Sequence, residues 1–195
     1  NTIDPQKFSS RIHVEYDNTL RTGDAVNYFY WYWKETTSER LSVSLPGGLP
    51  GSFPQESCVI WVKHTESKPS PRLWVNGDTV IFSPSTATLT VARSFNFHGG
   101  IVDTLDISFP VNTYLDWYEI EYPRKFECYN RQLFFESPKT SGIAQFNVSN
   151  LFSSQARLFD VTDYFDVKRF EGIQTEGAFA KFQDTISADA ATRYF

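Results

Sequence analysis

Few side chains in this sequence can act as nucleophiles or bases, since it contains two cysteines and three histidines. Cys58 and His64 are six residues apart in a run that alternates like a β-strand, so the strand rise separates them by about 20 Å. A thiol needs its base within hydrogen-bond reach, and these two residues therefore make no dyad within the strand. A pair of Cys128 with His13 or His98 stays open, because it depends on the fold.

The two cysteines also allow a disulfide bond. A bridge between Cys58 and Cys128 would close a long loop and add about 4 kcal/mol of stability if its geometry is suitable. The alternative is that both are small buried hydrophobic residues. We favour this alternative, because two cysteines carry no spacing signature, but the bridge stays open.

Two pairs of acidic residues have spacings that are compatible with metal binding or acid–base catalysis. Asp160 and Asp163 offer oxygen ligands of the kind that calcium binds, but such residues more often close a turn by accepting backbone hydrogen bonds, and we predict the turn. Glu119 and Glu121 share one strand face, as the carboxylate pair of a glycosidase could, although alternating charge on a solvated face explains them more simply. The three histidines show no zinc-ligand spacing. We therefore predict no catalytic residue, no metal site and no cofactor.

Aromatic rings and one glycosylation pattern are the remaining candidates for ligand chemistry. Jelly-roll domains commonly bind sugars on exposed rings, which raises the question of Trp61, Trp74 and Trp117. Trp61 lies in an apolar run and is predicted to be core, whereas Trp117 shares a face with two glutamates and is the best candidate for an exposed ring. An inter-sheet contact is still the favoured role of Trp117, and no ligand-binding residue is assigned. The run 147–149 (Asn-Val-Ser) matches the N-glycosylation acceptor pattern, which matters only if the source glycosylates.

The elements that must position these residues are strands. In Leu115–Arg124, Tyr118, Ile120 and Tyr122 alternate with Trp117, Glu119 and Glu121, which is the period of a strand with one buried face. Pro123 ends its ladder, because proline has no N–H to donate. Asn76-Gly77 is a strong hairpin signal, since both residues accept positive φ.

Composition supports an all-β fold. Aromatic residues make up 17% of the 195 residues, and flat rings pack well on pleated sheets. No segment shows sustained helical periodicity. About a dozen short strands predict an antiparallel, jelly-roll-like β-sandwich, built as one unit or as two packed β subdomains. The net charge of -5 leaves no basic patch for nucleic acid or anionic lipid, and no apolar run is long enough to span a membrane.

The predicted organisation has three parts. Residues 1–10 are polar and predicted to be loose, residues 11–124 form the jelly-roll-like sandwich, and residues 125–195 add strands that pack on it or extend it. The aromatic run Tyr28–Trp33 must cover one core face, and we expect a neighbouring domain to cover the other, with an exposed ligand platform as the alternative. The sequence contains no methionine, which indicates a segment cut from a longer protein.

Several short motifs, taken in order, resemble a known family. They are Leu73–Gly77 (Leu-Trp-Val-Asn-Gly), Phe95–Phe109, Leu115–Arg124, Leu133–Phe135 and Arg157–Asp163, whose last four residues read Asp-Val-Thr-Asp. From Trp61 to Phe195 the chain resembles the region ahead of the catalytic domain in gingipain-like (peptidase family C25) proteins, which include the sortase of the type IX secretion system. The family's cysteine peptidase motifs have no counterpart around Cys58 or Cys128.

This resemblance implies a non-catalytic accessory or interaction domain of a larger secreted or cell-surface protein. Its partners would be a neighbouring domain of the parent protein or a secretion partner, in the extracellular space, cell surface or periplasm of a Gram-negative bacterium. A peptidase domain would then follow Phe195. The alternative is a carbohydrate-binding module of the galactose-binding-like jelly-roll type, motivated by the same pattern and its aromatic residues.

Overall fold

The computed structural model describes residues 2–15, 19–22, 29–32, 34–36, 40–48, 58–66, 72–75, 78–81, 88–93, 102–108 and 113–195. These residues contain strands and no helix, and most strand pairs are antiparallel, which confirms the predicted all-β class. The strands are β1 (Thr2–Ile3), β2 (Phe8–Glu15), β3 (Thr19–Thr22), β4 (Phe29–Tyr32), β5 (Lys34–Thr36), β6 (Arg40–Pro46), β7 (Cys58–Glu66), β8 (Arg72–Val75), β9 (Asp78–Ile81), β10 (Thr88–Arg93), β11 (Val102–Ser108), β12 (Thr113–Arg124), β13 (Phe135–Glu136), β14 (Gly142–Val148), β15 (Phe159–Asp160), β16 (Lys168–Arg169), β17 (Gln174–Glu176), β18 (Phe179–Ile186) and β19 (Arg193–Tyr194). Within them no helix is long and apolar enough to cross a membrane.

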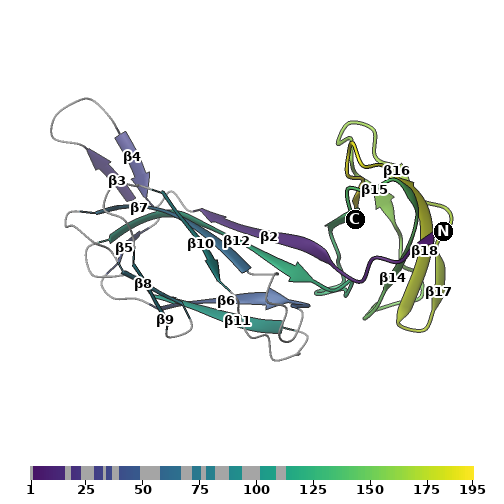
Figure 1. Ribbon diagram of the computed structural model, residues 1–195, viewed down its shortest axis with the longest axis horizontal. Helices are drawn as coiled ribbons and strands as arrows, with labels where there is room; N and C mark the ends of the chain where they lie inside the picture. The colour runs from purple at the N-terminus through teal and green to yellow at the C-terminus, as the bar shows by residue number, and fades with distance from the viewer. Residues whose placement is uncertain are drawn as a thin grey trace.

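The sheets form two lobes that lie end to end (Figure 1). The first lobe holds a sheet of order β10-β7-β12-β2, with β5 also paired to β12, a sheet of order β6-β11-β8-β9, and the pair β3-β4. The second lobe holds the sheets β1-β14-β18-β17 and β13-β19-β15-β16. The sheets regroup near the predicted 124/125 division, but whether each lobe is an independent domain stays a prediction.

Strand β12 lies inside its sheet, as its alternation predicts. It pairs with β7 on one side and with β2 on the other, and a bulge between Leu115 and Trp117 shifts its register against β7. Tyr118, Ile120 and Tyr122 are buried, whereas the alternate residues are partly exposed. The hairpin signal is also confirmed by the antiparallel pairing of β8 and β9 around residues 76–77, which themselves lie outside the described residues.

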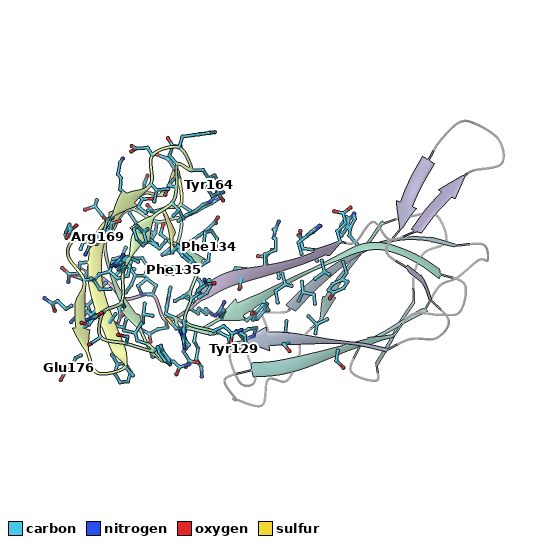
Figure 2. The ribbon with its side chains drawn as sticks, turned by 180° about the vertical axis from the view of Figure 1, so that it is seen from behind. Tyr129, Phe134, Phe135, Tyr164, Arg169 and Glu176 are labelled. Atoms are coloured by element: carbon cyan, nitrogen blue, oxygen red, sulfur yellow. The ribbon has the colours of Figure 1, made fainter. Side chains whose placement is uncertain are left out.

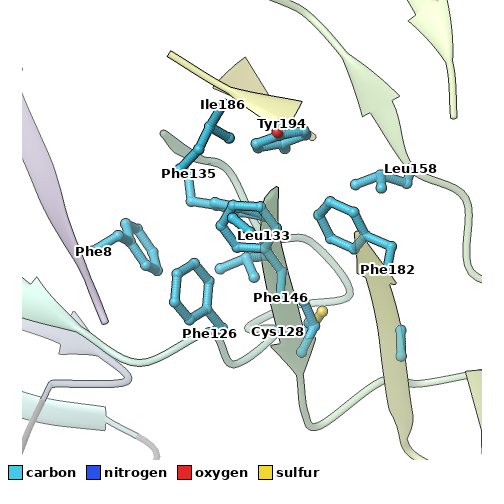
Figure 3. Packing of buried hydrophobic residues seen from close by; sticks show 13 residues of the cluster. Phe8, Phe126, Cys128, Leu133, Phe135, Phe146, Leu158, Phe182, Ile186 and Tyr194 are labelled. Carbon is cyan, nitrogen blue, oxygen red and sulfur yellow. The ribbon is translucent and has the colours of Figure 1, made fainter. Parts of the chain in front are cut away.

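The second lobe is built around aromatic rings (Figure 3). Phe146 and Phe182 are cross-strand partners on β14 and β18 and stack with ring centroids 4.9 Å apart. Phe135 stacks at the same distance on Tyr194, its cross-strand partner in the second sheet. The ring of Tyr194 also lies 5.3 Å from those of Phe146 and Phe182, which joins the second sheet to the first. Aromatic pairs of this kind add about 0.5–1.5 kcal/mol each beyond their burial.

The N-terminal segment corrects the sequence-based expectation. Residues 1–10 were expected to be loose, but β1 pairs in parallel with β14, and Phe8 is buried in the second lobe. Its ring lies 5.1 Å from that of Phe126 and 5.7 Å from that of Phe135. Two apolar residues among polar ones form no periodic pattern, so only their tertiary partners reveal that this segment is ordered.

Smaller differences concern short strands of the second lobe. Strands β15 and β16 contain only two residues each and β17 contains three, and the sequence pattern did not predict β17. The β15–β16 ladder has two residue pairs and the β17–β18 ladder has three, and strands this short are hard to recognise from a period of two in the sequence.

The aromatic core predicts a contrast between two phenylalanines. Phe135→Ala should lower the free energy of unfolding by about 3–5 kcal/mol, because it leaves a cavity among packed rings. Phe179→Ala should change it by less than about 0.5 kcal/mol, because Phe179 is 62% exposed. Urea unfolding followed by far-UV circular dichroism measures both, and equal losses would contradict this assignment of the core.

The buried hydroxyl of Tyr194 predicts a pH dependence. Burial and its 2.7 Å hydrogen bond to Asp184 Oδ2 raise the pKa of Tyr194 above its ordinary value. The unfolded chain ionises near pH 10 while the folded chain stays protonated, so this contribution is complete below about pH 10 and is lost above it, at about 1.4 kcal/mol per pH unit.

Tyr194→Phe should therefore be less stable at pH 7, by about 1 kcal/mol, and should lose less stability than the wild type between pH 9 and 11. Urea unfolding at both pH values measures the difference, in which the other tyrosines cancel. Parallel curves for the two proteins would contradict the role of Tyr194.

Candidate functional site at the junction of the lobes

Hydrogen bonds between the ends of β6 and β12 fix the point at which the chain leaves the first lobe. Tyr122 donates its hydroxyl to the Pro46 carbonyl at 3.1 Å, and the Lys125 N–H donates to the Gly47 carbonyl at 2.9 Å. Gly48 and Arg124 form an antiparallel bridge. The chain is therefore held against the first lobe at the point where it enters the second.

Arg124 lies at the centre of this junction. It is only 9% exposed, its Nη2 donates to the Glu127 carbonyl at 3.1 Å, and its guanidinium lies 5.7 Å from the centre of the Phe8 ring. Loss of solvent lowers the pKa of Arg124, but an ordinary value above 12 keeps it charged. Its buried Nε has no hydrogen-bond partner, so the side chain contributes packing and one strong bond at the cost of a desolvated N–H.

Two cavities open at the junction. The larger, of about 640 Å³, is lined from the first lobe by residues 8–12, Pro46 and Tyr122, and from the second lobe by Phe134, Tyr164 and Arg193 among others. The smaller, of about 440 Å³, lies next to it and shares Phe8, Ser9, Glu121, Tyr122 and Glu136.

The larger cavity runs along the edge of β2. Successive residues of a strand point to opposite faces, yet all five residues from Phe8 to Ile12 line this cavity. A cavity over one face would touch only alternate residues. In the described part of the chain, β12 is the strand that pairs with β2, and β13 lies close to the start of β2 without pairing with it.

The outer face of this sheet carries a charged network in which both predicted carboxylates take part. Arg11 pairs with Glu119 at 3.2 Å and with Glu121 at 3.1 Å. His13 lies between Glu119 at 3.2 Å and Glu15 at 3.3 Å, and its ring packs 5.6 Å from that of Trp117. Both glutamates are thus cross-strand partners of basic side chains on a solvated face, which agrees with the simpler prediction.

Exposed aromatic residues line the side of the second lobe that faces the junction. Figure 2 shows Phe134 and Tyr164 on this side, and they are 45% and 68% exposed. Phe165 follows in the same loop and is fully exposed. Sequence analysis missed these residues, although two adjacent aromatics in the acidic turn Asp163–Asp166 are a signal that could have found them.

The two predicted turn residues hold this loop as expected. Asp160 Oδ1 accepts the N–H of Thr162, and Asp163 Oδ1 accepts the N–H of Phe165, each at 2.9 Å. In the described part of the chain no three acidic, histidine or cysteine side chains group into a metal site. Both aspartates close turns through these side-chain bonds, as predicted.

Cys128 is a free thiol buried in the second lobe, so the alternative of a bridge to Cys58 is wrong. Burial raises the pKa of its thiol. Cys128 and His13 form no nucleophile–base pair, because Cys128 is buried in the aromatic core whereas the ring nitrogens of His13 are bonded to Glu119 and Glu15 on the exposed face of β2. The other candidates lie outside the residues whose side chains are described: Cys58, Trp61, His64, Trp74, His98 and the aromatic run Tyr28–Trp33.

The predicted glycosylation acceptor Asn147 is exposed, and its side chain donates a hydrogen bond to Asp4 Oδ1 at 3.0 Å. Its glycosylation stays a prediction.

Two glycines give a matched test of the junction. Gly47 and Gly177 have φ values of 64° and 56°, so alanine at either position should cost about 1 kcal/mol of strain. A Cβ at Gly47 would also lie 3.3 Å from Cγ and Nε of Arg124, whereas a Cβ at Gly177 meets nothing within 4 Å.

Gly47→Ala should therefore destabilise the chain more than Gly177→Ala and should speed hydrogen exchange at the Lys125 amide, which Gly177→Ala should leave unchanged. Urea unfolding and exchange measured by NMR test this. Identical behaviour of the two variants would contradict the role of Gly47 in the junction.

Comparison with known proteins places the fold. No protein-family model matches the sequence, and no curated protein matches it. Among solved structures, the chain is similar to the crystal structure of dimeric latent PorU from Porphyromonas gingivalis, with a TM-score of 0.64 and 11% sequence identity. The match covers 98% of this chain and 20% of the PorU chain. The chain therefore has the fold of a part of PorU that amounts to about a fifth of its length.

Proposed function

We propose that this chain is a non-catalytic interaction domain of a larger, secreted or cell-surface protein of the gingipain-like C25 type. It packs against a neighbouring domain of that protein or against a secretion partner and sets its orientation. The observation that carries the proposal is the fold match, which spans nearly all of this chain but only a fifth of PorU. The order of motifs in the sequence points to the same family.

The loop between β15 and β16 is the contact surface that we propose. Tyr164, Phe165 and Val167 are exposed there, and side chains of this size are costly to leave in water. The loop is not loose, because Asp163 accepts hydrogen bonds from the N–H of Phe165 through its side chain and from the N–H of Asp166, at 3.1 Å, through its carbonyl. Rigid aromatic anchors of this kind dominate the binding energy of protein interfaces.

Charge on the same loop supports a protein partner. Lys168 pairs with Asp166 at 3.2 Å, so the exposed rings are rimmed by polar groups, as the apolar centres of interfaces are. A carbohydrate-binding role stays the alternative. Among the described side chains no observation favours it, since the described ring beside Trp117 is that of His13, which packs against it at a tilt.

The coding sequence beyond residue 195 supplies the first test. A histidine and cysteine pair in C25-type motifs downstream would support the proposal. An open reading frame that ends without a further domain on either side would overturn it, and a glycan-binding screen of this chain would then test the alternative.

A binding measurement tests the proposed surface. We expect the 195-residue chain to bind the separately expressed neighbouring domain in isothermal titration calorimetry. Phe165→Ser should raise Kd at least about tenfold, because it removes a buried anchor of the interface. Phe179→Ser is the matched control, since Phe179 is also an exposed phenylalanine of the second lobe, and it should change Kd less than about twofold.

The two results have different consequences. Equal affinity of the wild type and Phe165→Ser would reject the loop as the contact surface. No binding of either flanking domain would overturn the proposed function itself.

A further inference from the structure

We infer that Arg124 binds the carboxylate of an acidic residue on the partner protein, while exposed rings of the larger junction cavity pack on the apolar residues beside that carboxylate. The inference rests on the proposed interaction function and deepens it by giving the chemistry of the partner segment. Its basis is a buried positive charge that has no negative partner among the described residues and that lines a cavity large enough to admit one.

Arg124 lacks the ion-pair partner that a buried charge usually has. Its Nη2 donates to a backbone carbonyl, that of Glu127, and its Nε is buried without a hydrogen-bond partner. Among the residues that the structure describes, Nη1 makes no hydrogen bond and no carboxylate oxygen lies within 4.0 Å of the guanidinium. The carboxylate of Glu127 lies instead 3.8 Å from Lys125 Nζ. Arg124 therefore has a donor to offer to an anion from outside the chain.

The other charged residues of the larger cavity are already paired. Arg193 Nε lies 2.9 Å from Glu136 Oε1, and Arg11 Nη2 lies 3.1 Å from Glu121 Oε2. Arg11 is shared with Glu119 on the outer face of β12. Because side chains alternate along a strand, Arg124 lies on the opposite, buried face of β12. The described lining contains five charged side chains, which are Arg11, Glu121, Arg124, Glu136 and Arg193. The charge of Arg124 is the one that this set leaves unbalanced.

Exposed rings in the same cavity favour apolar neighbours for the carboxylate. Phe134 and Tyr164 line the cavity, lie on the side of the second lobe that faces the junction (Figure 2), and are 45% and 68% exposed. The cavity of about 640 Å³ is of the size of known ligand pockets, about 300–1,000 Å³. Tyr164 also belongs to the loop between β15 and β16 that we propose as the contact surface, so a partner on that loop reaches the cavity.

The surroundings favour a carboxylate over a phosphate group. A single guanidinium balances one negative charge, whereas a phosphate group carries up to about two at neutral pH. Glu121 and Glu136 also line the cavity, and they would repel the second charge. The occupant is therefore a protein segment in which an acidic residue stands between apolar ones.

A pair of blocked tripeptides tests the inference without any variant. Acetyl-Val-Glu-Phe-amide carries one charge, that of its glutamate, and acetyl-Val-Gln-Phe-amide carries none. Each is titrated into the isotope-labelled chain and followed by NMR at the Nε–H of Arg124 and the N–H of Lys125. The glutamate peptide should shift both signals saturably. The glutamine peptide should bind at least about tenfold more weakly, because it lacks the charge-assisted hydrogen bond.

Free anions test whether the site takes a protein segment. Sodium acetate and sodium phosphate should bind at least about tenfold more weakly than the glutamate peptide, because they lack the apolar side chains that the exposed rings would cover. The same two NMR signals measure this difference.

A pair of arginine variants tests the residue itself. Arg124→Gln should abolish the preference for the glutamate peptide over the glutamine peptide, because the guanidinium that distinguishes them is gone. Arg124→Lys keeps the charge and should retain part of the preference. Arg157→Gln is the matched control, since Arg157 is an exposed arginine of the second lobe outside the described lining of the cavity, and it should keep the full preference. Urea unfolding must show that each variant is folded.

Four results would overturn the inference: no binding of the glutamate peptide, equal binding of the glutamine peptide, equal binding of acetate or phosphate, or an unchanged preference in folded Arg124→Gln. Failure of the proposed function is read separately, from the titration with the flanking domains. Peptide binding without domain binding would keep the carboxylate site and reject the proposed function. Domain binding without peptide binding would do the opposite.

Discussion

The insertion of Phe8 into the aromatic core of the second lobe is the contact on which the arrangement of this protein depends. Phe8 is the first residue of β2, a strand of the first lobe, yet its ring packs on Phe126 and Phe135. Arg124 lies over the same ring at the end of β12, the partner strand of β2. The chain thus crosses between the lobes twice, both times at the same end of the β2–β12 pair, where Phe8 lies opposite Arg124, and both crossings share a buried cluster. Two crossings restrict the relative rotation of the lobes more than a single linker would.

This arrangement creates the surfaces to which we assign binding. β2 is anchored at Phe8 by the second lobe and along its length by β12, and its first five residues line a cavity that both lobes bound. The aromatic loop of the second lobe projects near the same junction through Tyr164. A partner that contacts both the cavity and this loop would bind only when the two lobes are correctly placed relative to each other. This requirement fits a domain that orients its neighbours.

Sequence reasoning succeeded where a local rule was sufficient. The alternation of residues 115–124 identified β12 and its buried face, because a period of two needs only one strand to be recognised. The aspartates of residues 160–163 were expected to close turns, and they do so through bonds that span two residues. Sequence reasoning did not find the N-terminal segment or β17, because neither contains a periodic pattern. It also did not find the exposed rings of Phe134, Tyr164 and Phe165, because the exposure of a ring depends on the residues around it.

By itself the sequence determined the all-β class, the central strand, the hairpin at residues 76–77 and the absence of a local catalytic spacing at Cys58 and His64, since each follows from residue types and separations along the chain. Tertiary structure alone decided that Cys128 is a free buried thiol, that Phe8 and Arg124 join the lobes, and that a cavity follows the edge of β2. The physical reason is that these features are made by contacts between residues that are distant in the sequence, by more than one hundred positions for Phe8 with Phe126. Such contacts leave no periodic trace in the sequence, and only the packing of one lobe against the other selects them.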